Sequence, residues 1–353
     1  MFNCHAHLKK FHNDCVSLTE NMKQGMRARR DANRGRLARG IKKNNNIIPL
    51  KHVPQGSYAM HTMVQSEYDA SDIDDGVVFS KNDLIGPKGG EYSPSDAKYM
   101  VRDAIINDNA SFNTPPEVHT NCVRIFYNDG FTIDIPVYRL VEDQDGDNYY
   151  ELASTEWKKS DPEGVTNWFN TQVVEKSPDQ NNGRQMRRLA KLLKAWSKSR
   201  KSWNMPSGFI TSKLIDEKYY LDESLLDRDD KALLQIMEAI QERLKSNLVV
   251  DHPVIDEKIT KSDEDANMVE LRDRLLNAIT TLSILRRSDC TELDAVKALR
   301  EIFNTNHFDQ KIEELENEEK KSNNRQTAAG SITITGAEPQ TPVKKEGDDK
   351  RYA

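Results

Sequence analysis

The sequence of 353 residues has no long hydrophobic run. No window approaches the roughly 18 apolar residues that a membrane-spanning helix needs, so we expect no membrane association. The N-terminal residues MFNCHAHLKKFHND contain no apolar core, which argues against a secretory signal. Only four cysteines are present, without regular spacing, and this favours a reducing compartment over a disulfide scaffold. We therefore expect a cytoplasmic protein.

The sequence is also poor in apolar residues, at 36%, and rich in charged residues, at 31%. A typical domain has about 45–50% and about 25% respectively. The 11 Tyr, 10 Phe and 4 Trp nevertheless exclude disorder of the whole chain. The length favours two compact units or one bilobed enzyme.

The net charge of −6 conceals an uneven distribution along the chain. Residues 1–50 carry 11 basic and 3 acidic side chains, whereas residues 51–150 carry 7 basic and 17 acidic ones. An acidic centre beside basic segments indicates a polyanionic ligand that is held through divalent metal ions.

Secondary-structure signals divide the chain into four segments. Residues 1–46 contain a capping box, Ser17-Leu-Thr-Glu20, that opens a long proline-free helix through Lys43. Residues 47–155 favour a mixed α/β unit, 156–321 a helical unit, and 322–353 a disordered tail. In the second segment we expect strands at 77–79, 123–127 and 131–135 and a helix at 94–108 capped by Ser95; Asn128-Asp129-Gly130 indicates a hairpin. In the rest of the chain we expect helices at 162–174, 184–201, 207–217, 228–247, 264–286, 291–304 and 308–321.

The sharpest motif is a pair of carboxylates, Asp72 and Asp74, that precedes an apolar run. Residues two apart on a strand share a face, so these two would lie together and Asp75 would point away. Two close carboxylates resist ionisation unless a cation joins them, and oxygen ligands suit Mg²⁺. An acidic turn is the alternative interpretation of this motif taken alone.

Two further elements strengthen the functional interpretation. Asp134 falls within an apolar strand, where an unpaired carboxylate is costly. Gln55-Gly56-Ser57 precedes a short helical run, and glycine lets a phosphate approach the backbone closely. This ordered set is similar to the polymerase-β-type nucleotidyltransferase superfamily. The resemblance implies that Asp72, Asp74 and Asp134 hold two Mg²⁺ or Mn²⁺ ions and that Gly56 and Ser57 hold phosphates.

A basic helix adds to this pattern. Residues 184–201 contain eight Lys and Arg and no acidic residue. Met186, Leu189, Leu193 and Trp196 form an apolar face, while another face carries Arg187, Lys191, Lys194 and Lys198. A solvated surface explains such a stripe, and so does a bound triphosphate or nucleic-acid backbone that relieves the repulsion between like charges.

Motifs along most of the chain resemble one family more closely. They are QGSYAMHT, SDIDDGVVF, NCVRIFY, FTIDIPVY, WKKSDPEGVTNWFN, LLKAW and MPSGF, in this order. The set resembles the bacterial cGAS/DncV-like nucleotidyltransferases, especially the DncV-like branch, which make cyclic di- or oligonucleotide signals in CBASS anti-phage systems. The resemblance implies an α+β fold with a bilobed polymerase-β-type core, a helical C-terminal lobe and a long N-terminal helix that bridges both.

The same resemblance implies further nucleotide contacts. The implied residues are Gln55, Ser57, Arg124, Ser160, Lys194 and Asp256. The second serine of a family serine pair is Gly208 here, so Ser207 is expected to take over its triphosphate contact. Three arginines of the N-terminal helix, Arg27, Arg29 and Arg30, are expected to be surface or inter-lobe residues.

We therefore expect an enzyme that converts NTPs, with ATP and GTP as its substrates, into a cyclic GMP-AMP-like messenger for a downstream effector. The family resemblance also implies a ubiquitin-ligase-like E1/E2 partner that joins the terminal Ala353 to a target, although an inert tail explains the same sequence. No nucleic acid is expected to be obligatory. The alternatives are transfer to a protein or RNA acceptor, and a catalytically silent nucleic-acid-binding protein.

Overall fold

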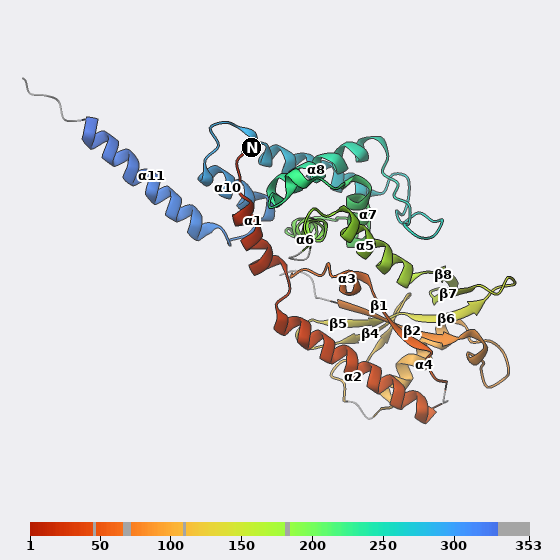
Figure 1. Ribbon diagram of the computed structural model, residues 1–353. Coiled ribbons are helices and arrows are strands. Elements are labelled where there is room, and N and C mark those ends of the chain that lie inside the picture. Colours follow the sequence, from red (N-terminus) through yellow and green to blue (C-terminus); the bar gives the residue numbers. More distant parts are fainter. Residues whose placement is uncertain (45–46, 66–71, 109–110, 181–183, 331–353) are drawn as a thin grey trace, which may run out of the picture. The chain divides into compact units, whose positions relative to one another are not determined.

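Strand β2 (Asp72–Ser80) lies at the centre of a mixed sheet in the computed structural model (Figure 1). The antiparallel strand β1 (Lys51–Gln55) pairs with one edge of β2. On the other edge, β5 (Thr132–Ile135) and β6 (Val137–Glu142) both run parallel to β2 and are separated only by Pro136. The structure describes residues 1–44, 47–65, 72–108, 111–180 and 184–330.

Antiparallel strands extend the sheet beyond β5 and β6. Beyond β5 lie β4 (Val123–Phe126) and the short β3 (Glu117–Val118); beyond β6 lie β7 (Asn148–Ala153) and β8 (Trp157–Ser160). The predicted hairpin between β4 and β5 is present, and Gly130 in its turn has a φ of +79°. Together with the helices this sheet confirms the predicted α+β class.

One face of the sheet packs against two helices, α2 (Glu20–Asn44) and α4 (Pro94–Ile106). Ile73, Val77 and Phe79 of β2 are fully buried in this core. They lie at alternate positions of the strand and therefore share the face of the sheet that packs against these helices. A Cβ at Gly40 would lie 1.7 Å from the carbonyl oxygen of Ala104, so glycine permits the close approach of α2 to α4. Helix α4 is capped by Ser93 rather than by the predicted Ser95, because Pro94 takes the first helical position.

The N-terminal segment contains the predicted long helix as α2 and, before it, a helical stretch that the sequence did not predict. Helix α1 (His5–Phe11) continues as a π-helix, η1 (His12–Val16). Helix α1 packs against α8 (Asp229–Ser246), and η1 packs against α6 (Gln185–Ser197). Helix α2 starts at Glu20, where Thr19 accepts a hydrogen bond from the N–H of Met22. Ser17 is therefore not the N-cap. It forms a β-bridge with Val64 instead.

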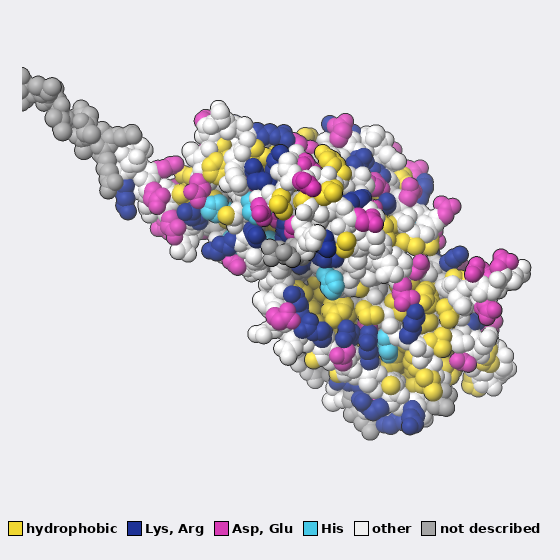
Figure 2. Space-filling view, viewed as in Figure 1, with side chains coloured by type: hydrophobic (Ala, Val, Ile, Leu, Met, Phe, Trp, Pro, Cys, Tyr) yellow, Lys and Arg dark blue, Asp and Glu magenta, His cyan; other side chains and the backbone are white. Residues whose placement is uncertain are grey.

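Three of the six arginines of α2 form ion pairs with acidic residues of the sheet half. Arg29 binds Asp129 in the β4–β5 turn, Arg34 binds Asp75 of β2, and Arg39 binds Asp108. Basic side chains gather along α2 in the space-filling view (Figure 2). These ion pairs neutralise three of the eleven basic side chains of residues 1–50 without a ligand.

Helices make up the chain after β8, as predicted. They are α5 (Pro162–Lys176), α6 (Gln185–Ser197), α7 (Gly208–Lys218), α8 (Asp229–Ser246), α9 (Ala266–Leu282) and α10 (Glu292–Phe303); short helical turns are α3 (Gly56–Ala59), η2 (Lys81–Asp83), η3 (Glu223–Leu225) and η4 (Ser283–Arg286). The predicted apolar face of α6 is buried, with Met186 and Leu189 fully inaccessible and Trp196 only 1% exposed.

Residues 1–309 form one compact unit, and the chain from Gln310 onward forms a second. The predicted boundary after residue 155 falls within the sheet, between β7 and β8, and the helices of this part of the chain begin only at Pro162. Helix α11 (Asp309–Gly330) continues past Lys321, where the sequence suggested that a disordered tail begins. Residues 331–353, with Ala353, lie outside the described residues. None of the helices in the described part of the chain combines the length and hydrophobicity that a bilayer crossing requires.

Candidate active site

Four strands carry a row of polar side chains across one level of the sheet. Gln55 of β1 pairs with Asp74 of β2, Asp74 pairs with Asp134 of β5, and Asp134 pairs with Arg124 of β4. Residues that are directly opposite on neighbouring strands point to the same face. The register therefore brings together residues from four separate stretches of the sequence.

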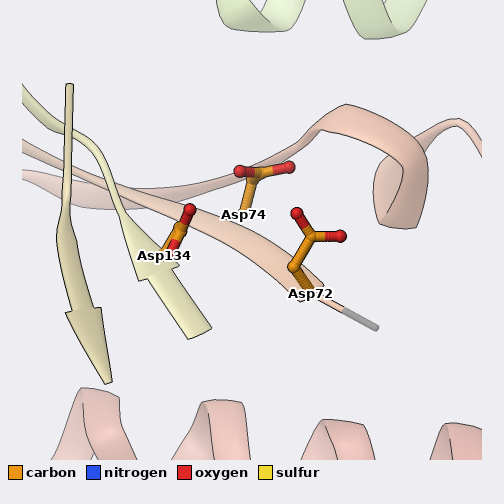
Figure 3. Close-up of side chains that lie close together, drawn as sticks. All are labelled: Asp72, Asp74 and Asp134. Carbon is orange, nitrogen blue, oxygen red and sulfur yellow. The ribbon is translucent and has the colours of Figure 1, made fainter. Parts of the chain in front are cut away.

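The three aspartates form a carboxylate cluster. Each offers an oxygen that lies within 4.8 Å of the oxygens offered by the other two. Asp72 and Asp74 project side by side from β2, and Asp134 faces them from β5 (Figure 3). Asp72 and Asp74 are partly exposed, whereas Asp134 is buried. Asp75 points the other way and binds Arg34 (Nε–Oδ2 2.7 Å), so its predicted structural position is observed.

The electrostatics of the cluster favour a bound cation. Burial raises the pKa of Asp74 to about 7, and the negative charges of Asp72 and Asp134 add to this effect. All the donors are carboxylate oxygens, which are the ligands that Mg²⁺ and Mn²⁺ prefer. The cluster is therefore chemically suited to the predicted ions.

Arg124 and Asp134 form a two-pronged ion pair, with Nε–Oδ1 at 2.7 Å and Nη2–Oδ2 at 2.6 Å. An ionised carboxylate has about four lone-pair sites, so this pair still leaves acceptor capacity on Asp134 for a metal ion. The predicted contact of Arg124 with a nucleotide remains a prediction, since the guanidinium is directed at Asp134.

A cavity of about 440 Å³ opens beside the carboxylates. Eight of the residues predicted for the site line it: Gln55, Gly56, Ser57, Asp72, Asp74, Ser160, Lys194 and Ser207. Asp256 is exposed on the segment between α8 and α9 and is not part of this lining, so its predicted contact with a base remains a prediction. The volume is within the range of about 300–1,000 Å³ that small-molecule sites occupy.

Gly56 and Asp74 are in close contact. Gly56 has a φ of +62°, in the left-handed region that favours glycine. A Cβ at this position would lie 2.2 Å from Oδ2 of Asp74. Glycine is therefore required at position 56 for two reasons. It adopts the left-handed backbone conformation, and it leaves the space that the carboxylate of Asp74 occupies.

Lys194 supplies positive charge to the same cavity from α6. It is only 8% exposed, and its Nζ donates to the carbonyl oxygen of Thr62 at 2.9 Å. Burial, with a smaller contribution from Lys198, lowers the pKa of Lys194 to about 8. An anionic ligand would reverse that penalty, because opposite charge nearby favours the ammonium form.

Sequence reasoning missed several residues of the cavity. Tyr138 donates from its hydroxyl to Oε1 of Gln55 at 2.9 Å and so fixes the carboxamide at the cavity wall. Thr62 holds Lys194, and Phe209 adds an apolar surface to the lining. Tyr138 falls in the quoted motif FTIDIPVY but carries no chemical signal of its own until β6 is placed beside β2.

Comparison with known proteins agrees with this geometry. Residues 50–138 match the family model described as "Cyclic GMP-AMP synthase DncV-like, nucleotidyltransferase domain", so this part of the chain is a DncV-like nucleotidyltransferase domain. The match contains β1, β2, β4, β5 and all three aspartates, and it confirms the family resemblance found in the sequence.

Solved structures show the same fold over most of the chain. The CD-NTase CdnG of Bradyrhizobium diazoefficiens, in complex with GTP, is similar with a TM-score of 0.67 and 14% identity over 88% of this chain and 99% of that one. The Vibrio cholerae DncV cyclic AMP-GMP synthase, in complex with a linear intermediate, is similar with a TM-score of 0.65 and 17% identity; the match covers 87% of this chain and 98% of that one. CdnC of E. coli MS115-1, with ATP, has a TM-score of 0.62 and 15% identity; the match covers 86% of this chain and 98% of that one.

The raised pKa of Asp74 leads to a prediction about metal binding. Since Asp74 must lose its proton to act as a ligand, we expect the affinity for Mn²⁺ to fall as the pH drops below about 7, by about tenfold per pH unit. Titration of the full chain with Mn²⁺, followed by electron paramagnetic resonance, measures this between about pH 5.5 and 8. A constant affinity over that interval would contradict the assignment of Asp74.

Gly208 leads to a second prediction. A Cβ there would lie 2.6 Å from Cε of Lys194, so a serine in the family position would displace the lysine. Ser207 instead caps α7, accepting from the N–H of Ile210 at 3.4 Å, and faces the cavity. We expect Gly208→Ala to weaken the binding of a non-hydrolysable NTP about tenfold or more, because a displacement of about 1 Å is costly at such sites. Calorimetry measures this affinity.

The matched test is the same substitution in a Lys194→Gln background. There we expect Gly208→Ala to have little further effect, because coupled residues are non-additive. Equal losses of affinity in both backgrounds would show that Gly208 acts by some route other than Lys194.

Proposed function

We propose that this protein is a metal-dependent nucleotidyltransferase that makes a cyclic di- or oligonucleotide messenger, of cyclic GMP-AMP type, from ATP and GTP in the cytoplasm. The observation that carries the proposal is the cluster of Asp72, Asp74 and Asp134, of which Asp72 and Asp74 line one cavity together with Gly56, Ser57 and Lys194. The structural relatives named above, described with GTP, with ATP or with a linear dinucleotide intermediate, support the same substrate class.

The three aspartates would hold two Mg²⁺ or Mn²⁺ ions, which lower the pKa of an attacking ribose hydroxyl and stabilise the leaving pyrophosphate. Gly56 presents bare backbone to the cavity, so a phosphate can approach closely. Ser57 offers a hydroxyl donor. Lys194 is positioned by one hydrogen bond to the carbonyl oxygen of Thr62. As far as the described residues show, up to two of its three N–H donors remain for the triphosphate.

Two sequential transfers would close the ring. In each, a ribose hydroxyl forms a bond to an α-phosphorus and the bond to pyrophosphate breaks. The hydroxyl proton leaves to solvent, and no covalent enzyme intermediate is needed. Arg124 would hold Asp134 in place through its two hydrogen bonds, at 2.7 and 2.6 Å.

Incubation with the four labelled NTPs and Mg²⁺ or Mn²⁺ tests the acceptor. A small product that resists phosphatase supports ring closure. Label on protein or on an RNA end would show instead that the chemistry serves another acceptor. The absence of any product, together with salt-sensitive binding of nucleic acid, would favour a silent binding protein.

We further propose a role in CBASS anti-phage defence, with a downstream effector that receives the product and an E1/E2-like partner that joins Ala353 to a target. This part rests on the family resemblance. Mass spectrometry after incubation with an E1/E2-like enzyme encoded beside the gene tests it. Detection of an isopeptide at Ala353 supports conjugation, and its absence with active partner enzyme contradicts it.

A further inference from the structure

A second cavity of about 250 Å³ lies between α6 and the N-terminal segment. Its walls include Lys9 of α1, His12 of the π-helix, Ser17, and Arg187 and Lys191 of α6. Among the described residues it shares no lining residue with the candidate active site. The basic stripe of α6 therefore serves two places: Lys194 and Lys198 face the first cavity, and Arg187 and Lys191 face the second.

No acidic residue is among the described residues that line the second cavity, and four of the lining residues are Lys or Arg. Arg187 donates only to neutral acceptors there, the carbonyl oxygen of Met60 at 3.2 Å and Oδ1 of Asn170 at 2.9 Å. Arg188, which also lines the cavity, is by contrast paired with Asp179 and Asp229. Arg187, Lys191 and Lys9 thus face a common space in which an anion would find three cations.

A hydrogen-bonded chain fixes Lys191 at this cavity. Nζ of Lys191 donates to Oγ of Ser17 at 3.4 Å, and Oγ of Ser17 lies 3.3 Å from Nε2 of His12. Nδ1 of His12 lies 2.9 Å from Oδ1 of Asn13, which can only accept, so Nε2 accepts from Ser17 in the neutral tautomer. Burial lowers the pKa of His12 to about 4, which keeps that ring neutral.

The local backbone is unusual as well. His12–Val16 form a π-helix, a rare conformation that is often found at functional sites. Burial and the nearby charges of Lys23 and Arg187 lower the pKa of Lys191 to about 8. A bound anion would favour the charged ammonium form of Lys191.

We propose that this second cavity is a binding site for a small phosphate-class anion. Charge-assisted hydrogen bonds from Lys191, Arg187 and Lys9 suit phosphate oxygens. The cavity is smaller than the roughly 300 Å³ at which sites for larger ligands begin, so it fits inorganic phosphate or pyrophosphate rather than a nucleoside triphosphate. The proposal does not depend on nucleotide transfer.

The experiment uses the full chain carrying Lys194→Gln, without metal, so that anion binding at the candidate active site is weakened. Calorimetry with inorganic phosphate and, separately, with pyrophosphate measures the remaining affinity. We expect Lys191→Gln in this background to lower the affinity for the anion that binds by about tenfold or more. The control is Lys201→Gln, which removes an equal charge at an exposed position outside both cavities and should leave affinity unchanged.

A second measurement separates anion binding from a structural role. Without anion, we expect Lys191→Gln to raise the melting temperature, because it removes a buried charge that its neighbours repel. If Lys191 served only to hold Ser17, the substitution would lower the melting temperature. The proposal is overturned if the Lys194→Gln protein binds neither anion, or if Lys191→Gln and Lys201→Gln bind equally well.

Discussion

Replacement of Asp74 by asparagine abolishes nucleotide transfer and at the same time stabilises the metal-free protein. Transfer should fall by about 10³-fold or more, because a ligand that contributes several kcal/mol of charge stabilisation is removed. The gain in stability follows from the pKa of Asp74, which burial and then the charges of Asp72 and Asp134 raise to about 7. At pH 8 the buried carboxylate is ionised, and this charge lowers the free energy of unfolding. Asparagine carries no charge and avoids that loss of stability.

The sign of this effect depends on pH. The folded-state pKa lies above the unfolded value, so the protonated carboxyl stabilises the fold at low pH, and that contribution is lost as the pH rises through about 7. The free energy of unfolding should therefore be larger for the variant by about 1–3 kcal/mol near pH 8, and the difference should vanish below about pH 4. Denaturant titrations with EDTA at the two pH values measure it.

The adjacent residue provides the matched control. Asp75 is buried, points away from the cluster and accepts two hydrogen bonds from Arg34. Asp75→Asn should therefore destabilise the protein by about 1–3 kcal/mol, since the partner cation is left without its counter-charge. Opposite signs at neighbouring positions are the expected result. Destabilisation by both variants would contradict the account of Asp74.

Replacement of Gly56 by alanine has the second large effect. Its Cβ would lie 2.2 Å from Oδ2 of Asp74, and the φ of +62° would cost a further ~1–2 kcal/mol for any other residue. The carboxylate must then move away from the position at which the register places it. Because a displacement of about 1 Å costs about 10²-fold in rate, we expect at least that loss in kcat/KM.

Gly130 separates the two causes. It has a similar backbone conformation, with a φ of +79°, but a Cβ there would meet nothing within 4 Å. Gly130→Ala should therefore lower the melting temperature by the backbone cost alone, which is less than the effect of Gly56→Ala, and should leave activity unchanged. An equal loss of activity in the two variants would show that backbone strain, rather than contact with Asp74, is responsible.

The sequence was sufficient to predict the part of the site that lies within one strand. The alternation of side chains along β2 puts Asp72 and Asp74 on one face and Asp75 on the other, and both placements are observed. The positions of the helices after residue 162 were also predicted from the sequence, and the apolar periodicity is clearest in α6. On the apolar face of α6, Met186 and Leu189 are fully buried.

Contacts between separate elements were not predictable from local patterns. The parallel pairing of β5 with β2 decides that Asp134 faces Asp74, and the antiparallel pairing of β4 decides that Arg124 binds Asp134. The capping-box pattern at Ser17 was misleading, because Ser17 pairs with Val64 and Thr19 starts the helix. Tertiary hydrogen bonds outweighed a local preference that is worth only about 1 kcal/mol.

The most direct test of the central claim is the stoichiometry of pyrophosphate release from ATP and GTP in the presence of Mg²⁺. Ring closure predicts one pyrophosphate for each nucleotide in the product, because every triphosphate is consumed. It also predicts that the release disappears in the Asp72→Asn, Asp74→Asn double variant. Fewer pyrophosphates than nucleotides would indicate a linear product, and release that persists in the double variant would contradict the proposed role of the carboxylate cluster.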